Sequence, residues 1–178
     1  MPTQAQHRQL GITLVESCVV LAIACMGVGA ALPAYERAVE RHHVEGAAAQ
    51  LRSDFHFARS QAASSQQSVR FSVGAATSNC YVVHTGGAKD CDCGPQGEAI
   101  CKAGARALRT GRFAADGPIS LHSNSPSMLI HPGHGTVTPT GTIRVQGRQG
   151  ARLHLVVNIL GRMRSCVAAG ALPGQPNC

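Results

Sequence analysis

The longest apolar stretch of the chain runs from Gly11 to Leu32 and contains one carboxylate, Glu16. From Ile12 onward it holds 21 residues, and about 20 apolar residues span the hydrocarbon core of a bilayer as a helix. This is longer than the apolar core of about 7 to 15 residues in a cleaved signal peptide, and no clean A-x-A cleavage site closes it. The pattern therefore predicts a retained membrane helix over residues 12–33. A charge at the centre of a bilayer costs roughly 2.5 kcal/mol or more, so we expect Glu16 to have a partner.

Beyond Pro33, apolar residues recur at the three- and four-residue spacing that places them on one face of a helix. This face comprises Val44, Ala47, Ala48, Leu51, Phe55, Ala58 and Ala62. A partner-binding helix would show the same stripe, but the spacing is more typical of a helix packed on a core. We expect one long helix that continues from the membrane into a soluble domain and ends in the polar run Ser64–Ser68.

The rest of the chain predicts strands. Alternation at Val69–Val73 indicates a first strand, and Cys80–His84 is a candidate for a second. Four short runs separated by turns containing Pro or Gly make the last third β: Met128–Ile130, Thr136–Thr138, Thr142–Val145 and Leu153–Leu160. A helix followed by strands predicts an α+β fold, in which the second half of the helix packs on an antiparallel sheet.

The segment between these strands is harder to interpret. Gly86–Gly104 is rich in glycine and cysteine and is predicted to be a loop. Arg106, Arg109 and Arg112 follow at a spacing of three. This spacing suits either a basic helical stripe or a solvated face, and we favour the solvated face.

Positive charge is concentrated at the C-terminal end of the chain. The 178 residues have a formal net charge of +7, yet only 14% of them are charged. From Gly117 to Cys178 there is no Asp or Glu. The cations of this region are Arg144, Arg148, Arg152, Arg162 and Arg164. Such a region suits an acidic partner, for example nucleic acid or an anionic membrane surface. At the other end, His7 and Arg8 precede the apolar run and favour a cytoplasmic N-terminus.

Of the eight cysteines, Cys18 and Cys25 lie in the apolar run. The others are Cys80, Cys91, Cys93, Cys101, Cys166 and Cys178. An even number after an export-like segment indicates disulfides in an oxidising compartment. Zinc is less favoured, because C-x-C-x7-C lacks paired C-x2-C knuckles. We expect Cys91 and Cys93 each to pair with Cys80 or Cys101, and we favour a Cys166–Cys178 bridge.

The string G-I-T-L-V-E, Gly11 to Glu16, resembles the signal of type IV prepilins. The resemblance implies that a prepilin peptidase cuts between Gly11 and Ile12 and that the new amino group of Ile12 is methylated. It also implies that Glu16 pairs with the N-terminal amine of a neighbouring subunit during assembly, which would neutralise the buried charge. Pro33 stands where pilins often carry a kinking proline. Ile12 departs from the Phe usual in major pilins and is more typical of minor members.

Further stretches resemble the FimT/GspH group of minor pilins and pseudopilins. They are L-R-S-D-F-H-F-A-R-S-Q-A (Leu51–Ala62), G-T-V-T-P-T-G-T-I (Gly135–Ile143) and V-V-N-I-L-G-R-M-R-S-C (Val156–Cys166). The resemblance implies a pilin-like fold with a leader at 1–11, a transmembrane and assembly helix at 12–33 and a periplasmic or extracellular domain at 34–178. The implied partners are other major and minor pilins. The implied location is the inner membrane of a Gram-negative bacterium before assembly, then a pilus. The cysteine-containing segment from about Gly74 to Pro118 departs from the family.

The motif G-R-M-R, Gly161 to Arg164, is the strongest candidate for a specific activity. Gly161 suits a tight turn, from which Arg162 and Arg164 would project together. Two guanidinium groups can bind phosphate oxygens bidentately, and Arg148 and Arg152 would extend the patch. In FimT proteins of natural transformation, a G-R-x-R motif at this position binds DNA. A merely solvated surface is the alternative.

Catalysis has little support in the sequence. No G-x-S-x-G or H-E-x-x-H string occurs, and acids that would orient a base are absent after Asp116. His131 and His134 flank a Pro-Gly turn and are interpreted as solvent-facing, so we expect no enzyme activity, no metal and no cofactor.

Two functions remain as hypotheses. The first is a FimT-like minor pilin that binds double-stranded DNA weakly and without sequence preference for uptake in natural transformation. The second is a structural subunit without DNA binding, either a GspH-like pseudopilin of type II secretion or a minor pilin that primes pilus assembly.

Overall fold

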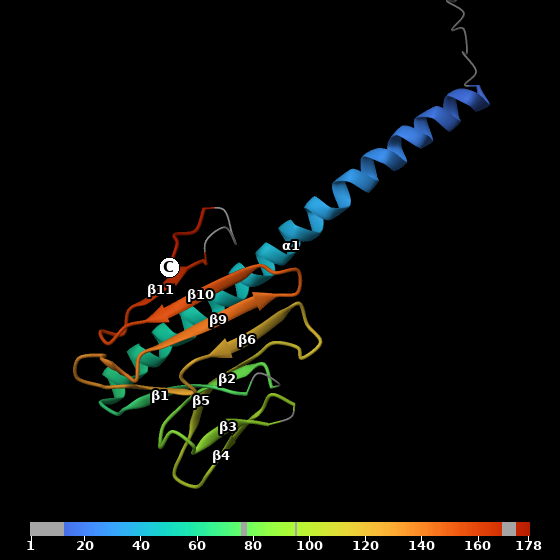
Figure 1. The fold of residues 1–178 in the computed structure, drawn as a ribbon. Coiled ribbons are helices and arrows are strands. Elements are labelled where there is room, and N and C mark those ends of the chain that lie inside the picture. Colours follow the sequence, from blue (N-terminus) through green and yellow to red (C-terminus); the bar gives the residue numbers. More distant parts are fainter. Residues whose placement is uncertain (1–12, 76–77, 95, 169–173) are drawn as a thin grey trace, which may run out of the picture. The chain divides into compact units, whose positions relative to one another are not determined.

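The long helix expected from the sequence is present as α1, Leu14–Ser65 (Figure 1). The computed structural model describes residues 13–75, 78–94, 96–168 and 174–178. These residues form two compact units, Met1–Ala38 and Val39–Cys178, and α1 contributes to both. The predicted cleavage site at Gly11 and Ile12 lies outside the described residues.

The first half of α1 has the length and composition of a membrane helix. An 18-residue window within it has a mean hydropathy of 2.1, and none of that window is buried. It is the one such helix in the part of the chain that the structure describes. Pro33 lies inside the helix. The apolar run therefore remains compatible with a retained membrane anchor.

The second half of α1 packs one face on the core of the larger unit. The buried positions include all those of the predicted stripe, and Leu51 and Phe55 are fully enclosed. Four of the other five stripe positions are alanines, whose small side chains allow the sheets to approach the helix axis closely. The prediction of a core-packed helix is confirmed.

Five antiparallel strands form the first sheet, in the order β5-β2-β1-β7-β8. Their bounds are β1 Val69–Val73, β2 Cys80–His84, β5 Ala107–Arg112, β7 Ser127–Ile130 and β8 Val137–Thr138. Residues of β1 alternate between the helix-facing side, with Phe71, and the opposite side, with Ser72. Phe71 lies between Phe55 of α1 and Tyr81 of β2, with ring centroids 5.7 and 5.2 Å away.

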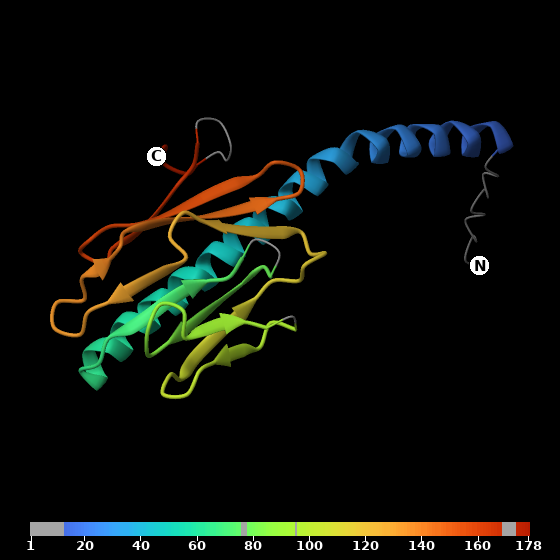
Figure 2. The ribbon, with the colours of Figure 1, turned by 60° about the horizontal axis from the view of Figure 1, so that its bottom comes forward.

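A second antiparallel sheet has four strands in the order β11-β10-β9-β6 (Figures 1 and 2). They are β6 Ile119–Ser123, β9 Gly141–Gly147, β10 Arg152–Val157 and β11 Met163–Cys166. Ile143, Val145 and Leu155 face inward and are fully buried in the same core as the helix stripe. The sequence predicted one sheet, whereas the strands divide between two.

The cysteine-rich segment is a short hairpin, β3 Cys91–Cys93 with β4 Ala99–Cys101. The bond Cys91–Cys101 joins its two strands, and Cys80–Cys93 ties it to β2. We call β3, β4 and the residues from Gly86 that lead into them the cysteine flap. The segment predicted to be a loop thus contains two short strands, because the disulfides supply the constraint that such short strands lack.

The three arginines at spacing three lie at a strand, not on a helix. Arg109 and Arg112 belong to β5, which pairs with β2. Arg109 is not simply solvated: its Nη1 donates to Asp54 Oδ1 at 2.7 Å, and its guanidinium lies 4.0 Å from the centre of the Phe57 ring. The strand conformation here depends on pairing with β2, which is distant in the sequence. A local spacing of three therefore does not predict it.

Candidate nucleic-acid interface

The G-R-M-R motif lies at the turn that joins β10 to β11. Backbone bonds close this turn: Asn158 N–H donates to Arg162 O at 3.1 Å, and Gly161 N–H donates to Asn158 O at 2.9 Å. The side-chain oxygen of Asn158 accepts a further bond from Arg162 N–H at 2.9 Å. Asn158 therefore binds the backbone of both Gly161 and Arg162.

Gly161 is required by both conformation and space. Its φ of +68° lies in the left-handed region, which residues with a Cβ adopt only with strain. A Cβ at this position would stand 2.3 Å from the carbonyl oxygen of Gly135 and 3.0 Å from Arg59 Nε. The turn is also anchored to β8, because Val137 N–H donates to Ile159 O at 2.9 Å. The β10–β11 turn is therefore rigidly seated on the end of the first sheet.

Arg162 and Arg164 are both exposed. Arg162 ends the turn, and Arg164 lies on the edge strand β11 opposite Val156 of β10. Within the described residues neither guanidinium has an ion-pair or hydrogen-bond partner. Both are therefore available to an anion in solution.

The other two predicted arginines lie elsewhere. Arg148 is in the β9–β10 turn, at the opposite end of β10 and roughly 20 Å from Arg162 at about 3.3 Å per strand residue. Its Nε donates to Gly117 O at 3.1 Å, and its Nη2 donates to Asp116 O. Arg148 is thus tied to a neighbouring turn and does not extend the patch at the motif. Arg152 begins β10 and is exposed on the same face as Arg164.

The C-terminal tail is fixed beside the motif. A disulfide joins Cys166 to Cys178, the pair favoured from the sequence. Val167 N–H donates to Pro176 O at 2.9 Å, and Cys178 N–H donates to Val167 O at 3.0 Å. A groove of about 360 Å³ lies between the tail and β10–β11, and Arg164 and Val156 line it. The bridge therefore places a shallow apolar groove next to Arg164.

Sequence reasoning missed the apolar part of this surface. Ile159 and Leu160 are 57% and 60% exposed in the turn, directly before Gly161. The sequence predicts these two residues as the end of a strand, because an apolar run does not show where strand pairing stops. An apolar pair immediately preceding a turn glycine is the signal that would have found them.

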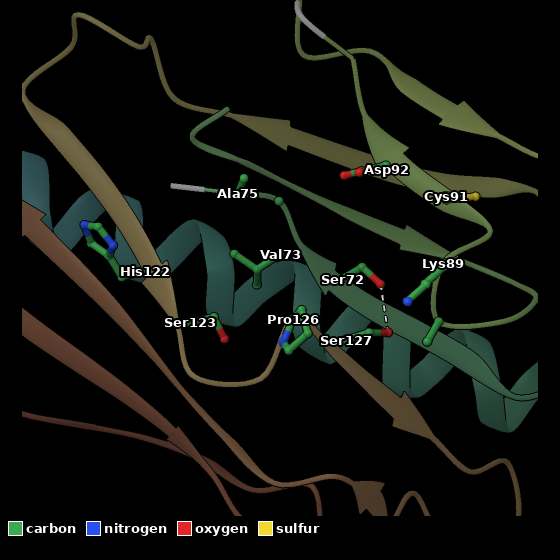
Figure 3. A pocket seen from close by; sticks show the side chains of 12 residues that line it. Ser72, Val73, Ala75, Lys89, Cys91, Asp92, His122, Ser123, Pro126 and Ser127 are labelled. Atoms are coloured by element: carbon green, nitrogen blue, oxygen red, sulfur yellow. Dashed lines mark hydrogen bonds between the residues drawn. The ribbon is translucent and has the colours of Figure 1, made fainter. Parts of the chain in front are cut away.

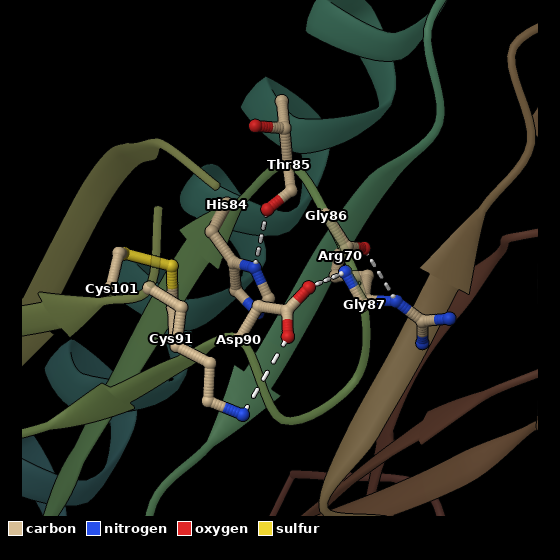
Figure 4. Close-up of polar contacts among 9 residues, drawn as sticks. Arg70, His84, Thr85, Gly86, Gly87, Asp90, Cys91 and Cys101 are labelled. Carbon is tan, nitrogen blue, oxygen red and sulfur yellow. Dashed lines mark hydrogen bonds and ion pairs between the residues drawn. A yellow bond between two sulfur atoms is a disulfide. The ribbon is translucent and has the colours of Figure 1, made fainter. Parts of the chain in front are cut away.

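A second cluster of polar groups lies under the cysteine flap and was also missed. His84 is fully buried, and its Nε2 is 2.8 Å from Ser72 Oγ. Its Nδ1 is 3.0 Å from Thr85 O (Figure 4). Because a carbonyl oxygen only accepts, Nδ1 carries the proton of the neutral ring and Nε2 accepts from Ser72. Burial lowers the pKa of His84, and the nearby Arg70 acts in the same direction. Asp90, which accepts from Gly87 N–H at 2.6 Å, opposes them weakly.

A cavity of about 610 Å³ opens between this cluster and the flap (Figure 3). Ser72 and Ser127, whose hydroxyl oxygens are 2.9 Å apart, line it from the first sheet. Lys89 reaches from the flap toward these hydroxyl groups, and His122 lies at the far side. Asp92 also lines the cavity, but His84 Nδ1 bonds to Thr85 O, so no carboxylate among the described residues orients His84 as a base.

Glu16 also takes part in the N-terminal cap of α1, and the sequence shows the spacing for it. The hydroxyl of Thr13 accepts from Glu16 N–H at 3.2 Å, directly before α1 begins at Leu14. Thr13 and Glu16 thus have the T-x-x-E spacing of a capping box. A carboxylate in the first turn also interacts favourably with the helix dipole. Glu16 is suited to that position in an isolated subunit as well as in an assembly.

One helix with an apolar first half, followed by antiparallel sheets packed on its second half, defines a pilin-like protein. The family model of the type II transport protein GspH matches residues 47–161, and the chain belongs to this family. Membership implies assembly with other pilins, as a minor pilin or pseudopilin. The matched region ends at Gly161, so Arg162 and Arg164 lie just beyond it.

Solved structures show the same fold. The type IV minor pilin FimU of Pseudomonas aeruginosa is similar in two crystal forms, each 14% identical to this chain. In the first, the TM-score is 0.53, and the match covers 75% of this chain and 96% of FimU. In the second, the TM-score is 0.50, with 72% and 97% covered. A comparison with curated proteins found no match.

Proposed function

We propose that this GspH-family subunit is a minor type IV pilin that binds DNA through Arg162 and Arg164. The observation that carries the proposal is a pair of exposed guanidinium groups without a partner among the described residues, on a turn that is fixed at Gly161 and Asn158. The turn fixes the backbone from which the two side chains project, and the planar guanidinium fork matches phosphate oxygens. The surrounding C-terminal third contains no acid that would compete with the phosphates.

Binding would be to the phosphate backbone and would not depend on base sequence. No Phe, Tyr or Trp follows Phe113, so the stacking platforms of single-strand binders are absent from this part of the sequence. Each neutralised phosphate of duplex DNA contributes about 0.9 to the slope of log affinity against log salt. A few arginines per subunit make weak sites, and several subunits in one fibre would capture DNA by multivalency.

The proposed route to the fibre begins with a prepilin peptidase, which cuts between Gly11 and Ile12 and leaves the apolar helix in the inner membrane. Methylated Ile12 then starts the mature chain, and Glu16 meets the amine of a neighbouring subunit. The bond from Glu16 N–H to the Thr13 hydroxyl supports this assignment, because it places Glu16 in the first turn of the helix. Retraction of the pilus would draw bound DNA across the outer membrane.

The test compares Arg→Gln variants of the full chain in detergent by gel shift with a duplex of random sequence. Arg162→Gln with Arg164→Gln should abolish most binding and lower the salt slope by about 1.8, which is two phosphates at about 0.9 each. Arg148→Gln is the matched control, because its guanidinium is already bound to backbone oxygens at the far end of β10. Absence of binding by the parent chain, or a double variant that binds like the parent, would refute DNA binding.

The second candidate function is a purely structural subunit, and Ile159 and Leu160 favour it. Two exposed aliphatic side chains at one turn suit a contact with another pilin. Replacing both with serine should impair incorporation into the fibre if the turn is an assembly surface, and should leave incorporation intact if the turn serves DNA alone. Immunoblotting of sheared pili measures the difference.

We also propose that the chain is not an enzyme. Ser72 and His84 are the nearest approach to a nucleophile and base among the described residues. Thr85 O occupies the position of the orienting group, and Ser72 is only 8% exposed. The pair is therefore better suited to fixing the flap than to attacking a substrate.

A further inference from the structure

The outer face of the four-stranded sheet is cationic, and the C-terminal tail lies against it at His154, where Cys178 Sγ is 3.8 Å from Nδ1. Side chains of β6, β9 and β10 alternate between the buried core and this face, and the strand register aligns them in rows. The residues of the face are Ser120, His122, Thr142, Arg144, Gln146, Arg152, His154, Val156 and Arg164. We call these nine residues the outer sheet face. It contains three arginines and two histidines but no carboxylate.

The arginines of the outer sheet face are close enough to act on one ligand. Arg144 of β9 is directly opposite His154 of β10, and Arg152 of β10 is two residues along from His154. With strands about 4.8 Å apart and about 3.3 Å per residue, the Cα atoms of Arg144 and Arg152 are roughly 8 Å apart. The same geometry puts Arg144 and Arg164 roughly 12 Å apart. A duplex carries one phosphate charge per about 3.4 Å of its axis on each strand, so arginines at these spacings can reach different phosphates of one duplex.

The charges of the outer sheet face are not neutralised within the protein. Arg109, Arg112 and Arg148 elsewhere each donate to a carboxylate or a carbonyl oxygen. In the described residues no such acceptor is recorded for Arg144, Arg152 or Arg164. The pKa of His154 is lowered by burial and then by Arg144 and Arg152, in agreement with their closeness. Unpaired like charges on adjacent strands repel each other, and a polyanion would relieve this repulsion.

We propose that duplex DNA lies along the outer sheet face, with its phosphates on Arg144, Arg152 and Arg164 and with Arg162 at the rim. This inference rests on the proposed function and extends the DNA-binding site from the β10–β11 turn to the outer sheet face. The face presents no Phe, Tyr or Trp ring of the kind on which single-strand binders stack bases, so the proposed ligand is a duplex. Four arginines then contribute about 3.6 to the salt slope of one subunit, at about 0.9 each.

The experiment measures duplex affinity of the full chain in detergent across a series of salt concentrations. Arg144→Gln with Arg152→Gln leaves Arg162 and Arg164 intact and should lower the slope by about 1.8, with affinity reduced several-fold at low salt. Arg106→Gln is the matched control, since Arg106 is equally exposed but precedes β5 of the other sheet. Its slope should equal that of the parent. Arg144→Lys with Arg152→Lys should retain the slope, because lysine keeps the positive charge. This variant separates an effect of charge from an effect on folding.

The outcomes distinguish the two proposals. Loss of binding on changing Arg162 and Arg164, with an unchanged slope on changing Arg144 and Arg152, would overturn the outer sheet face and leave the turn as the site. A parent chain that does not bind duplex would overturn the proposed function itself. Equal or tighter binding of a single-stranded oligonucleotide would also overturn this inference. Thermal unfolding of each variant establishes that it is folded.

Discussion

Gly161 shows how one residue sets the position of the two candidate arginines. Its left-handed φ and its contact with the carbonyl oxygen of Gly135 leave no room for a side chain. The sequence indicated a turn at this glycine, and the packing of that turn on the β7–β8 connection was visible only in three dimensions.

Gly161→Ala should lower the free energy of unfolding by about 1 to 3 kcal/mol from backbone strain, with a further loss from the clash. Gly150→Ala is the control, because Gly150 has a φ of +104° but nothing lies within 4 Å of its added Cβ. Urea unfolding measures the free energy of unfolding of both variants. Equal losses at the two positions would mean that strain alone, and not the contact with Gly135, makes Gly161 necessary.

His84 should make the stability of the soluble unit depend on pH. Burial lowers its pKa below the ordinary value of about 6.5. As pH falls below about 6.5, the unfolded chain binds a proton on this residue before the folded chain does, so the unfolded state gains stability. The contribution of His84 is therefore fully present above about pH 6.5 and is lost progressively below it.

Unfolding by urea at pH 7.5 and pH 5.5 tests this dependence. The parent should lose more stability on acidification than His84→Gln, whose amide cannot titrate. His154, whose pKa is also lowered, contributes in the same direction and remains in both proteins. A parent and variant with the same pH dependence would show that the pKa of His84 does not differ between the folded and the unfolded chain.

At the scale of elements, disulfides determine the local structure where the strands are shortest. β3 and β4 have three residues each, and in the described part of the tail after β11 the one β-bridge joins Val167 to Asn177. Hydrophobic burial in such short segments is too small to offset the cost of ordering them. Covalent bridges reduce that cost by restricting the unfolded chain.

Replacing Cys166 and Cys178 with serine should lower stability by about 2 to 3 kcal/mol, as expected for a loop of this length. The sequence separation is 12, close to the 13 of the Cys80–Cys93 pair, which makes the latter a matched control. Loss of the tail bridge should perturb NMR signals of β10 and β11, whereas loss of Cys80–Cys93 should perturb those of β2 and the flap. Similar perturbation of both regions by either variant would contradict independent roles.

At the scale of the soluble unit, a polar network joins the helix to two strands of the first sheet. Asp54 of α1 accepts from Tyr81 O–H of β2 at 2.6 Å and from Arg109 of β5 at 2.7 Å. Burial and the bond to Asp54 raise the pKa of Tyr81. Gly111 leaves space for the Tyr81 ring, because a Cβ there would lie 2.1 Å from its Cζ.

Asp54→Ala should destabilise the unit by about 1 to 3 kcal/mol, because it leaves the buried hydroxyl of Tyr81 without its acceptor. Tyr81→Phe removes the same hydrogen bond but keeps Asp54 with Arg109, so its loss should be smaller. Guanidinium unfolding of the two variants checks this order. A larger loss for Tyr81→Phe would show that the ring hydroxyl, and not the carboxylate, is the centre of the network.

The sequence by itself determined the long helix, its buried stripe, the first strand and the C-terminal disulfide, since each depends on local period, length or spacing. It also indicated the exposed pair Arg162 and Arg164, because alternation in a strand keeps residues two apart on one side. Only the tertiary structure decided that the strands divide between two sheets and that Arg109 belongs to a strand bound to Asp54. Only strand register, which joins residues distant in sequence, brings Arg144, Arg152 and Arg164 onto one face and places Arg148 outside it.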